Sequence, residues 1–219
     1  PYLFHLDASA NIIKQYEDPF VAAFSMSMWN EQLSLHVARE VKRRFPECKI
    51  VVGGAQVPHS PETFFDQYPF IDIAVRGEGE EAFTEILERL VDGEDLAGLA
   101  GVSWRDSNGE FINNSTDRPF NRDLDTYPSP YVSGLFDDLI DTRDDLTFQA
   151  IVETNRGCPF LCTFCYWGKG GLSRKYRYHS LNRVNQEIEW MGKRGIQYVF
   201  NADSNFGMHR RDMEIAKFL

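Results

Sequence analysis

The chain has 219 residues, of which 42% are hydrophobic and 14% aromatic, so it can form one large domain or two small ones with proper cores. Its formal net charge of -10 disfavours a nucleic-acid partner, because contacts to phosphates supply most of that affinity. No apolar run reaches the roughly 20 residues that span a bilayer, and no signal-peptide pattern opens the chain, so we expect a cytoplasmic protein without a membrane partner.

Strands and helices are expected to alternate over the first 93 residues. Apolar runs typical of buried parallel strands cover 20–25, 49–52 and 71–75. Amphipathic helices are expected after each run, behind Asn30 as N-cap, from Ser60-Pro61-Glu62 onward, and around 83–90. This alternation predicts an α/β fold with a doubly wound, Rossmann-like parallel sheet.

Serine or glycine follows closely after each of these three expected strands. Parallel strands end at the same edge of a sheet, where α/β proteins bind their ligands. The residues at the three ends are Ser25, Met26, Ser27 and Met28, then Gly53 and Gly54, and finally Gly77 and Glu78. A glycine pair after a strand is more often a plain turn, so these positions alone do not identify a ligand.

A hairpin and a linker follow. Asp106-Ser-Asn-Gly109 between two apolar segments predicts the hairpin, and the polar, proline-containing stretch 113–131 is typical of a linker. We therefore place a domain boundary near residue 120. The expected division is a first domain over 1–120, a linker with a short helix over 121–145, and a second domain over 146–219.

Three cysteines follow the apolar run 148–152 in the spacing Cys-x3-Cys-x2-Cys: Cys158, Cys162 and Cys165. They would lie on a loop at the carboxyl end of a strand. A cubane iron–sulfur cluster normally takes four cysteines, so three leave one iron open to an outside ligand. The remaining Cys48 precedes a different strand and is expected to be incidental.

Two other interpretations of the three cysteines have less support. A structural zinc site could add His179, but zinc ligands usually come as two short pairs rather than as three crowded residues and a distant fourth. A disulfide would leave an odd thiol, and nothing else in the sequence indicates secretion.

With Phe164 just before the last cysteine, this loop resembles the signature of the radical S-adenosylmethionine (SAM) family. The resemblance implies a [4Fe–4S] cluster whose open iron binds SAM, and an electron from a flavodoxin- or ferredoxin-type donor that cleaves SAM to a 5′-deoxyadenosyl radical. It also implies the first strands of a partial (β/α) barrel, with a second strand over 197–201. In the next loop the family holds the SAM amino group with Gly-Gly-Glu, and Asp203 and Asn205 occupy that place here. Capping of the next helix is an equally good role for them.

Side chains beyond the last cysteine are less informative. Tyr166 and Trp167 could wall the adenine of SAM, although packing is the commoner role of such residues. A basic cluster could meet a phosphate or the SAM carboxylate, although a solvated face is its commoner fate. Its members are Arg174, Lys175 and Arg177.

The first domain resembles the cobalamin-binding domain that precedes the barrel in cobalamin-dependent radical SAM enzymes. The family's Ser-x-Leu matches Ser25-Met-Ser27 except that serine replaces leucine, its Gly-Gly matches Gly53-Gly54, and Gly77-Glu78 stands at the third strand end. The family loop Asp-x-His-x-x-Gly is absent from the sequence. The resemblance implies that cobalamin lies against 25–28, Gly53-Gly54 and Gly77-Glu78. The implied cofactors are the cluster, SAM and cobalamin.

The resemblance implies an enzyme, foremost a methyltransferase that moves a methyl group from methylcobalamin to an unactivated carbon of a small-molecule substrate. Two alternatives stay open: a ring rearrangement or cyclisation without methyl transfer, and a non-catalytic metal-binding module. A tRNA methylthiotransferase shares the cysteine spacing, but the acidic chain and the cobalamin-like first domain disfavour it. On the methyltransferase interpretation we expect the chain to be a fragment truncated at both ends, with the later barrel strands missing.

Overall fold

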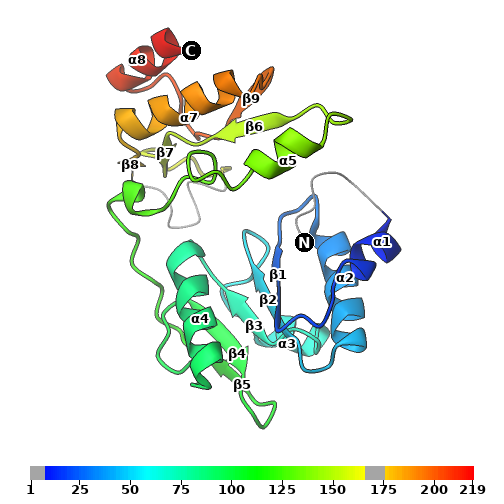
Figure 1. Ribbon diagram of the computed structural model, residues 1–219. Helices are drawn as coiled ribbons and strands as arrows, with labels where there is room; N and C mark the ends of the chain where they lie inside the picture. The colour runs from blue at the N-terminus through cyan, green and yellow to red at the C-terminus, as the bar shows by residue number, and fades with distance from the viewer. Residues whose placement is uncertain (1–7, 166–175) are drawn as a thin grey trace. The chain divides into compact units, whose positions relative to one another are not determined.

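Two units make up the chain, of which the computed structural model describes residues 8–165 and 176–219. The first unit ends at Pro119 and the second begins at Phe120 (Figure 1). No helix within the described ranges is both long and apolar enough to cross a membrane.

A five-stranded sheet in the order β1-β2-β3-β4-β5 forms the centre of the first unit (Figure 1). Its strands are β1 (Val21–Ser25), β2 (Lys49–Gly53), β3 (Ile73–Val75), β4 (Val102–Arg105) and β5 (Phe111–Asn113). The first three run parallel, as predicted, whereas β4 and β5 form the predicted hairpin and pair antiparallel with β3 and with each other. The sheet is therefore mixed, because the hairpin extends it instead of standing apart.

Helices cover both faces of this sheet. They are α1 (Ser9–Lys14), α2 (Glu31–Arg44), α3 (Glu62–Gln67) and α4 (Glu80–Asp92). Because side chains alternate along a strand, Ile50 and Val52 of β2 pack with α2 and α3 on one face, and Val51 packs with α4 on the other. This two-sided cover is the reason that β2 and β3 are continuous apolar runs, and it confirms the Rossmann-like α/β class.

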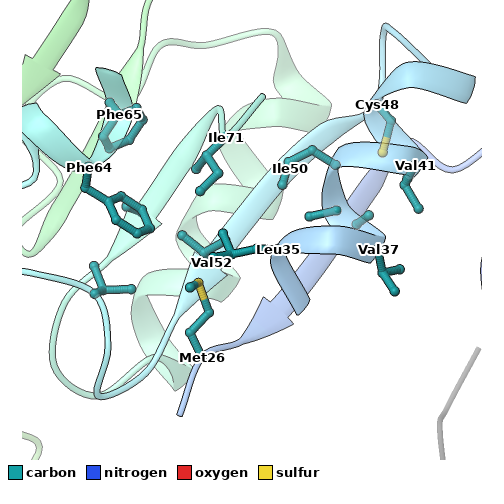
Figure 2. Close-up of a cluster of buried hydrophobic side chains, with 14 of the residues drawn as sticks. Met26, Leu35, Val37, Val41, Cys48, Ile50, Val52, Phe64, Phe65 and Ile71 are labelled. Carbon is teal, nitrogen blue, oxygen red and sulfur yellow. The ribbon is translucent and has the colours of Figure 1, made fainter. Parts of the chain in front are cut away.

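The core between the sheet and α2 contains Cys48, the cysteine outside the Cys-x3-Cys-x2-Cys motif. Figure 2 shows Cys48 beside Val41, at the end of the cluster away from Met26. Burial raises the pKa of the Cys48 thiol and so opposes the thiolate form that a metal would need. Cys48 is thus a packing residue at the amino end of β2.

The second unit is built on a parallel pair of strands, β6 (Gln149–Val152) and β9 (Tyr198–Asn201), connected through α7 (Leu181–Lys193). Ser180 caps α7, since its side chain accepts a hydrogen bond from the backbone N–H of Arg183. Met191 packs α7 onto one face of the two strands, and Ile215 packs α8 (Arg210–Phe218) onto α7.

The opposite face of this strand pair is open in the described part of the chain. Ile151, Tyr198 and Phe200 are more than half exposed, and the register pairs Ile151 with Phe200 and Gln149 with Tyr198. Parallel sheets are normally covered on both faces, so an apolar face left open is unusual for this architecture.

The smaller elements of the second unit are η1 (Leu124–Thr126), α5 (Asp137–Thr142), β7 (Asn155–Arg156) and β8 (Arg177–Tyr178). The short helix expected within 121–145 is α5, which begins at Asp137 after turns between Ser129 and Gly134. β7 pairs antiparallel with β8, so this ladder joins the chain shortly before the first cysteine to the chain after the loop. It was not predicted, because two-residue strands have no readable periodicity.

Candidate cofactor sites

The parallel register brings the three predicted ligand loops of the first unit to one edge. Ser25 pairs with Gly53, and Gly53 pairs with Val75. The chain therefore leaves β1, β2 and β3 at neighbouring points, and Gly77-Glu78 follows β3 at the same edge. Here the structure joins residues that lie some 25 to 50 positions apart in the sequence.

Asn30 gives the loop after β1 its shape. Its Oδ1 accepts a hydrogen bond from the Ser27 backbone N–H at 2.7 Å, and its Nδ2 donates to the Ser25 carbonyl at 3.0 Å. The prediction that its side chain caps α2 is wrong: Asn30 directly precedes α2 but makes no side-chain cap, because its amide turns back into the loop. An Asx-type side chain serves either purpose, and the sequence does not show which.

The large side chains of the loop after β1 differ in exposure. Met28 is 79% exposed and Trp29 is 82% exposed, whereas Met26 is 0% exposed and packs in the core. We therefore leave Met26 out of the proposed ligand contacts, because the whole residue, backbone included, is buried. Trp29 was not predicted as a ligand contact. Its exposure beside the strand ends is what indicates such a role, and exposure cannot be read from the sequence. A large exposed apolar pair of this kind typically marks a binding surface.

Gly54 lies where the loops after β1 and β2 contact each other. Its φ is +110°, and a Cβ there would lie 2.7 Å from the Met26 carbonyl oxygen. Met26 in turn donates its N–H to the Gly53 carbonyl at 2.7 Å, and its own carbonyl accepts from Gln56 at 3.1 Å. Gly54 was predicted for a close approach to a ligand, but it is required here by the interlocking of the loops after β1 and β2.

Arg76 fixes the third loop and was not predicted. This buried side chain donates to Ser103 Oγ at 2.7 Å and to the Asn114 carbonyl at 2.6 Å. It thereby ties the start of the Gly77-Glu78 turn to the β4–β5 hairpin. A Cβ at Gly77 would meet no atom within 4 Å, so space beside this turn is open.

The three cysteines of the second unit differ in burial. Cys158 is 8% exposed, Cys165 is partly buried and Cys162 is exposed. Cys165 donates its backbone N–H to the Cys162 carbonyl at 3.2 Å, so these two share a turn. Phe164 between them is 91% exposed and free to meet a ligand.

The three thiols suit a cluster by their chemistry rather than by their present spacing. Within 8–165 and 176–219, no three His, Cys, Asp or Glu side chains are grouped so that they could hold a metal ion. Three thiolate donors on one short loop are the ligand set of an iron–sulfur cluster with one open iron. Metal sites of this kind are often completed only when the metal binds.

Asp203 braces the segment that leads to the cysteines. Its Oδ1 accepts from the backbone N–H groups of Thr154 at 2.6 Å and Asn155 at 3.1 Å, and its Oδ2 accepts from Thr154 Oγ1 at 2.5 Å. The helix-capping role considered for Asp203 is wrong, because His209 and Asp212 form the capping box of α8. The carboxylate instead joins the loop after β9 to the end of β6.

Asn205 reaches the first cysteine. Its Nδ2 lies 3.1 Å from Cys158 Sγ and 2.9 Å from Ser204 Oγ, and Ser204 Oγ donates to the Gly157 carbonyl at 2.6 Å. The loop after β9 is therefore hydrogen-bonded to the segment from Thr154 to Cys158 through Asp203, Ser204 and Asn205. Only the Oδ1 of Asn205 is left for the predicted contact with an ammonium group.

The other candidate ligands near this loop have structural partners. His179 is buried, and its Nδ1 lies 3.1 Å from Asp125 Oδ1. Burial alone would raise the pKa of Asp125, but hydrogen bonds from Ser180 and His179 lower it overall. Arg177 stacks on the Phe120 ring at 4.9 Å, so the solvated face considered for it is wrong. The expectations for Tyr166, Trp167, Arg174 and Lys175 concern residues outside the described ranges.

Known proteins match both units of the chain. Residues 4–87 match the model of the B12 binding domain. The 2-(S-pantetheinyl)-carbapenam-3-carboxylate methyltransferase of Streptantibioticus cattleyicolor is 40% identical over 220 residues, which cover 99% of this chain and 32% of that protein. The cobalamin-dependent radical SAM methyltransferase TokK of Streptomyces tokunonensis is 40% identical over 205 residues, which cover 92% of this chain and 30% of that protein.

A solved structure supports the fold. The cobalamin-dependent S-adenosylmethionine radical enzyme OxsB with aqua-cobalamin bound matches with a TM-score of 0.69 and 21% identity, over 95% of this chain and 29% of that one. The chain spans about a third of the length of the two methyltransferases that it matches. By its B12-binding segment, its fold and these relatives, the chain belongs to the family of cobalamin-dependent radical SAM enzymes.

Proposed function

We propose that this protein is a cobalamin-dependent radical SAM methyltransferase that acts on an unactivated carbon of a small-molecule substrate. The observation that carries the proposal is one chain holding both a B12-type strand edge and a three-cysteine loop, at 40% identity to two methyltransferases along 92% or more of its length. When bound, the cluster with SAM supplies a carbon radical, and cobalamin supplies a methyl group.

The first unit would hold cobalamin over the carboxyl ends of β1, β2 and β3. The supporting observation is that the three loops share an edge and leave a large apolar pair uncovered there. A flat, largely apolar corrin would cover that pair and remove it from water. The residues proposed to contact it are Ser25, Ser27, Met28, Trp29, Gly53, Gly77 and Glu78.

The second unit would hold the cluster through Cys158, Cys162 and Cys165. Phe164 and the Oδ1 of Asn205 would contact SAM, and Asp203 would position the loop rather than bind SAM with a free carboxylate. An electron donor of the flavodoxin or ferredoxin type would reduce the cluster. We place the protein in the cytoplasm, where thiols remain reduced.

β6 and β9 would be the first two strands of the partial barrel, with Ile151, Tyr198 and Phe200 facing its interior. Tyr131 supports this orientation, because its hydroxyl donates to the Ile151 carbonyl at 2.6 Å and accepts from the Ile151 N–H at 3.1 Å. A phenol thus occupies the free edge of β6, so further strands would add beside β9. The interior face would line the substrate space.

Methyl-labelled SAM tests the reaction type without knowledge of the substrate. The intact protein is loaded anaerobically with iron, sulfide and cobalamin, then reduced and incubated with the labelled compound. Label recovered in the corrin supports a methyltransferase. Formation of 5′-deoxyadenosine without label in the corrin would instead indicate a rearrangement or cyclisation. A protein that binds neither iron nor corrin would be a non-catalytic module.

A further inference from the structure

We propose that Asn205 sets the reduction potential of the cluster through a hydrogen bond to the sulfur of Cys158. The proposal rests on the proposed function, because it requires Cys158 to be a cluster ligand. The supporting contact is the 3.1 Å distance between Asn205 Nδ2 and Cys158 Sγ.

The hydrogen-bond network determines which end of the Asn205 amide faces the sulfur. Ser204 Oγ lies 2.6 Å from the Gly157 carbonyl oxygen, which can only accept, so the hydroxyl proton is directed there. The same Oγ can then only accept from its second neighbour, which lies 2.9 Å away on Asn205. That neighbour must be the nitrogen, and it is this nitrogen that also reaches Cys158 Sγ.

Cys158 is the cysteine whose place is already fixed by the protein. It is 8% exposed, whereas Cys162 is exposed, and the Gly157 carbonyl just before it is held by Ser204. Upstream, Asp203 holds the buried Thr154 and Asn155. An N–H group aimed at this sulfur would therefore keep its geometry when the cluster binds.

The direction of the effect follows from charge. Reduction adds an electron to the cluster and its thiolate ligands, and an N–H donor stabilises the more negative state more strongly. Hydrogen bonds to cluster sulfurs are among the factors that set such potentials. Asn205 should accordingly raise the potential, and its loss should make the cluster harder to reduce.

The test compares wild type, Asn205→Ala and Asn201→Ala in the intact protein, reconstituted anaerobically and studied without SAM. Asn201→Ala is the matched control, because it removes a side-chain hydrogen bond of the same loop, the one that Asn201 Oδ1 accepts from the Asp203 N–H at 2.7 Å, and leaves Asn205, Ser204 and Cys158 untouched. Iron and sulfide are quantified first, and the midpoint potential is then followed by electron paramagnetic resonance. We expect a lower potential in Asn205→Ala and little change in Asn201→Ala. Equal potentials in wild type and Asn205→Ala, or equal shifts in both variants, would overturn the inference.

A second measurement covers the case in which Asn205→Ala no longer holds iron. Wild-type protein labelled with ¹⁵N-asparagine should show a nitrogen hyperfine coupling to the reduced cluster in pulsed resonance, and its absence would overturn the inference. A wild type that binds a cluster but lacks this coupling contradicts the role of Asn205 alone. A wild type that binds no cluster contradicts the proposed function and this inference together.

Discussion

The two units hold their candidate sites in different ways. In the first, helices cover both faces of the sheet, and the loops at its edge are fixed by backbone hydrogen bonds, one glycine and the side chains of Asn30 and Arg76. In the second, α7 covers one face of two strands, and side-chain hydrogen bonds fix the strand ends. The first site therefore combines an interlocked backbone with two polar side chains, whereas the second depends on individual polar side chains.

This difference predicts where single substitutions should act. The contact between the loops after β1 and β2 is made by backbone atoms, so it should fail where the backbone is constrained, as at Gly54. A site held by side chains should respond at each of them, as at Asp203 and Tyr131. The predictions below test this contrast.

The largest expected effect is loss of the cluster when a loop cysteine is replaced. Cys158→Ala, Cys162→Ala and Cys165→Ala should each lower iron content sharply, because each removes one of only three thiolate ligands. Cys48→Ala is the control and should leave iron content unchanged, since Cys48 lies in the core of the other unit. Full iron retention in all three loop variants would disprove the ligand assignment.

The next largest effect is expected at Gly54. An alanine there must adopt a φ of +110° and place its Cβ 2.7 Å from the Met26 carbonyl oxygen. We expect a loss of about 2–4 kcal/mol in the free energy of unfolding of the first unit. Gly53→Ala is the matched control, because its Cβ would meet only Val75, at 3.8 Å. Denaturant titration measures both, and similar losses in the two variants would contradict the interlocked-loop account.

Replacement of Asp203 should destabilise the second unit. Asp203→Ala leaves the buried N–H groups of Thr154 and Asn155 without their acceptor, at a cost of about 2–3 kcal/mol. Asp203→Asn keeps one acceptor oxygen and should lose less. Thermal and denaturant unfolding compare the variants, and an unchanged stability of Asp203→Ala would show that water replaces the brace.

The smallest effect is expected for Tyr131→Phe, which removes the hydroxyl at the edge of β6 and should cost about 1 kcal/mol at pH 7. Burial raises the pKa of Tyr131 in the folded protein. The stabilisation is therefore complete below the ordinary tyrosine pKa of about 10 and is lost as pH rises above it. Unfolding free energies of both proteins between pH 7 and pH 11 should converge at the alkaline end. A difference that grows with pH would contradict the sign.

Much of the fold could be predicted because its signals are local. The apolar runs around β2 and β3 reflect burial on both faces, and Ser180 and Gly93 mark helix ends by their own conformational preferences. The cysteine spacing is likewise local. Each of these signals is contained in a window of a few residues.

The contacts that complete the sites could not be predicted, because they join distant positions. Asp203 bonds to Thr154 across 49 residues, and Tyr131 bonds to Ile151 across 20. Asn30 shows a second limit: its position was predictable, but the direction of its side chain depends on the loop before it. The exposure of Trp29 is also a tertiary property, since an apolar residue usually indicates burial.

The central claim is that one chain carries two cofactor sites on separate units, and reconstitution tests it most directly. The intact protein and its Cys158→Ala variant are incubated anaerobically with iron, sulfide and cobalamin, desalted, and analysed for iron, sulfide, zinc and corrin. The account predicts one [4Fe–4S] cluster and one corrin per wild-type chain, with the variant losing the cluster and retaining the corrin. A wild type that binds no corrin, or that takes up zinc in place of an iron–sulfur cluster, would contradict it.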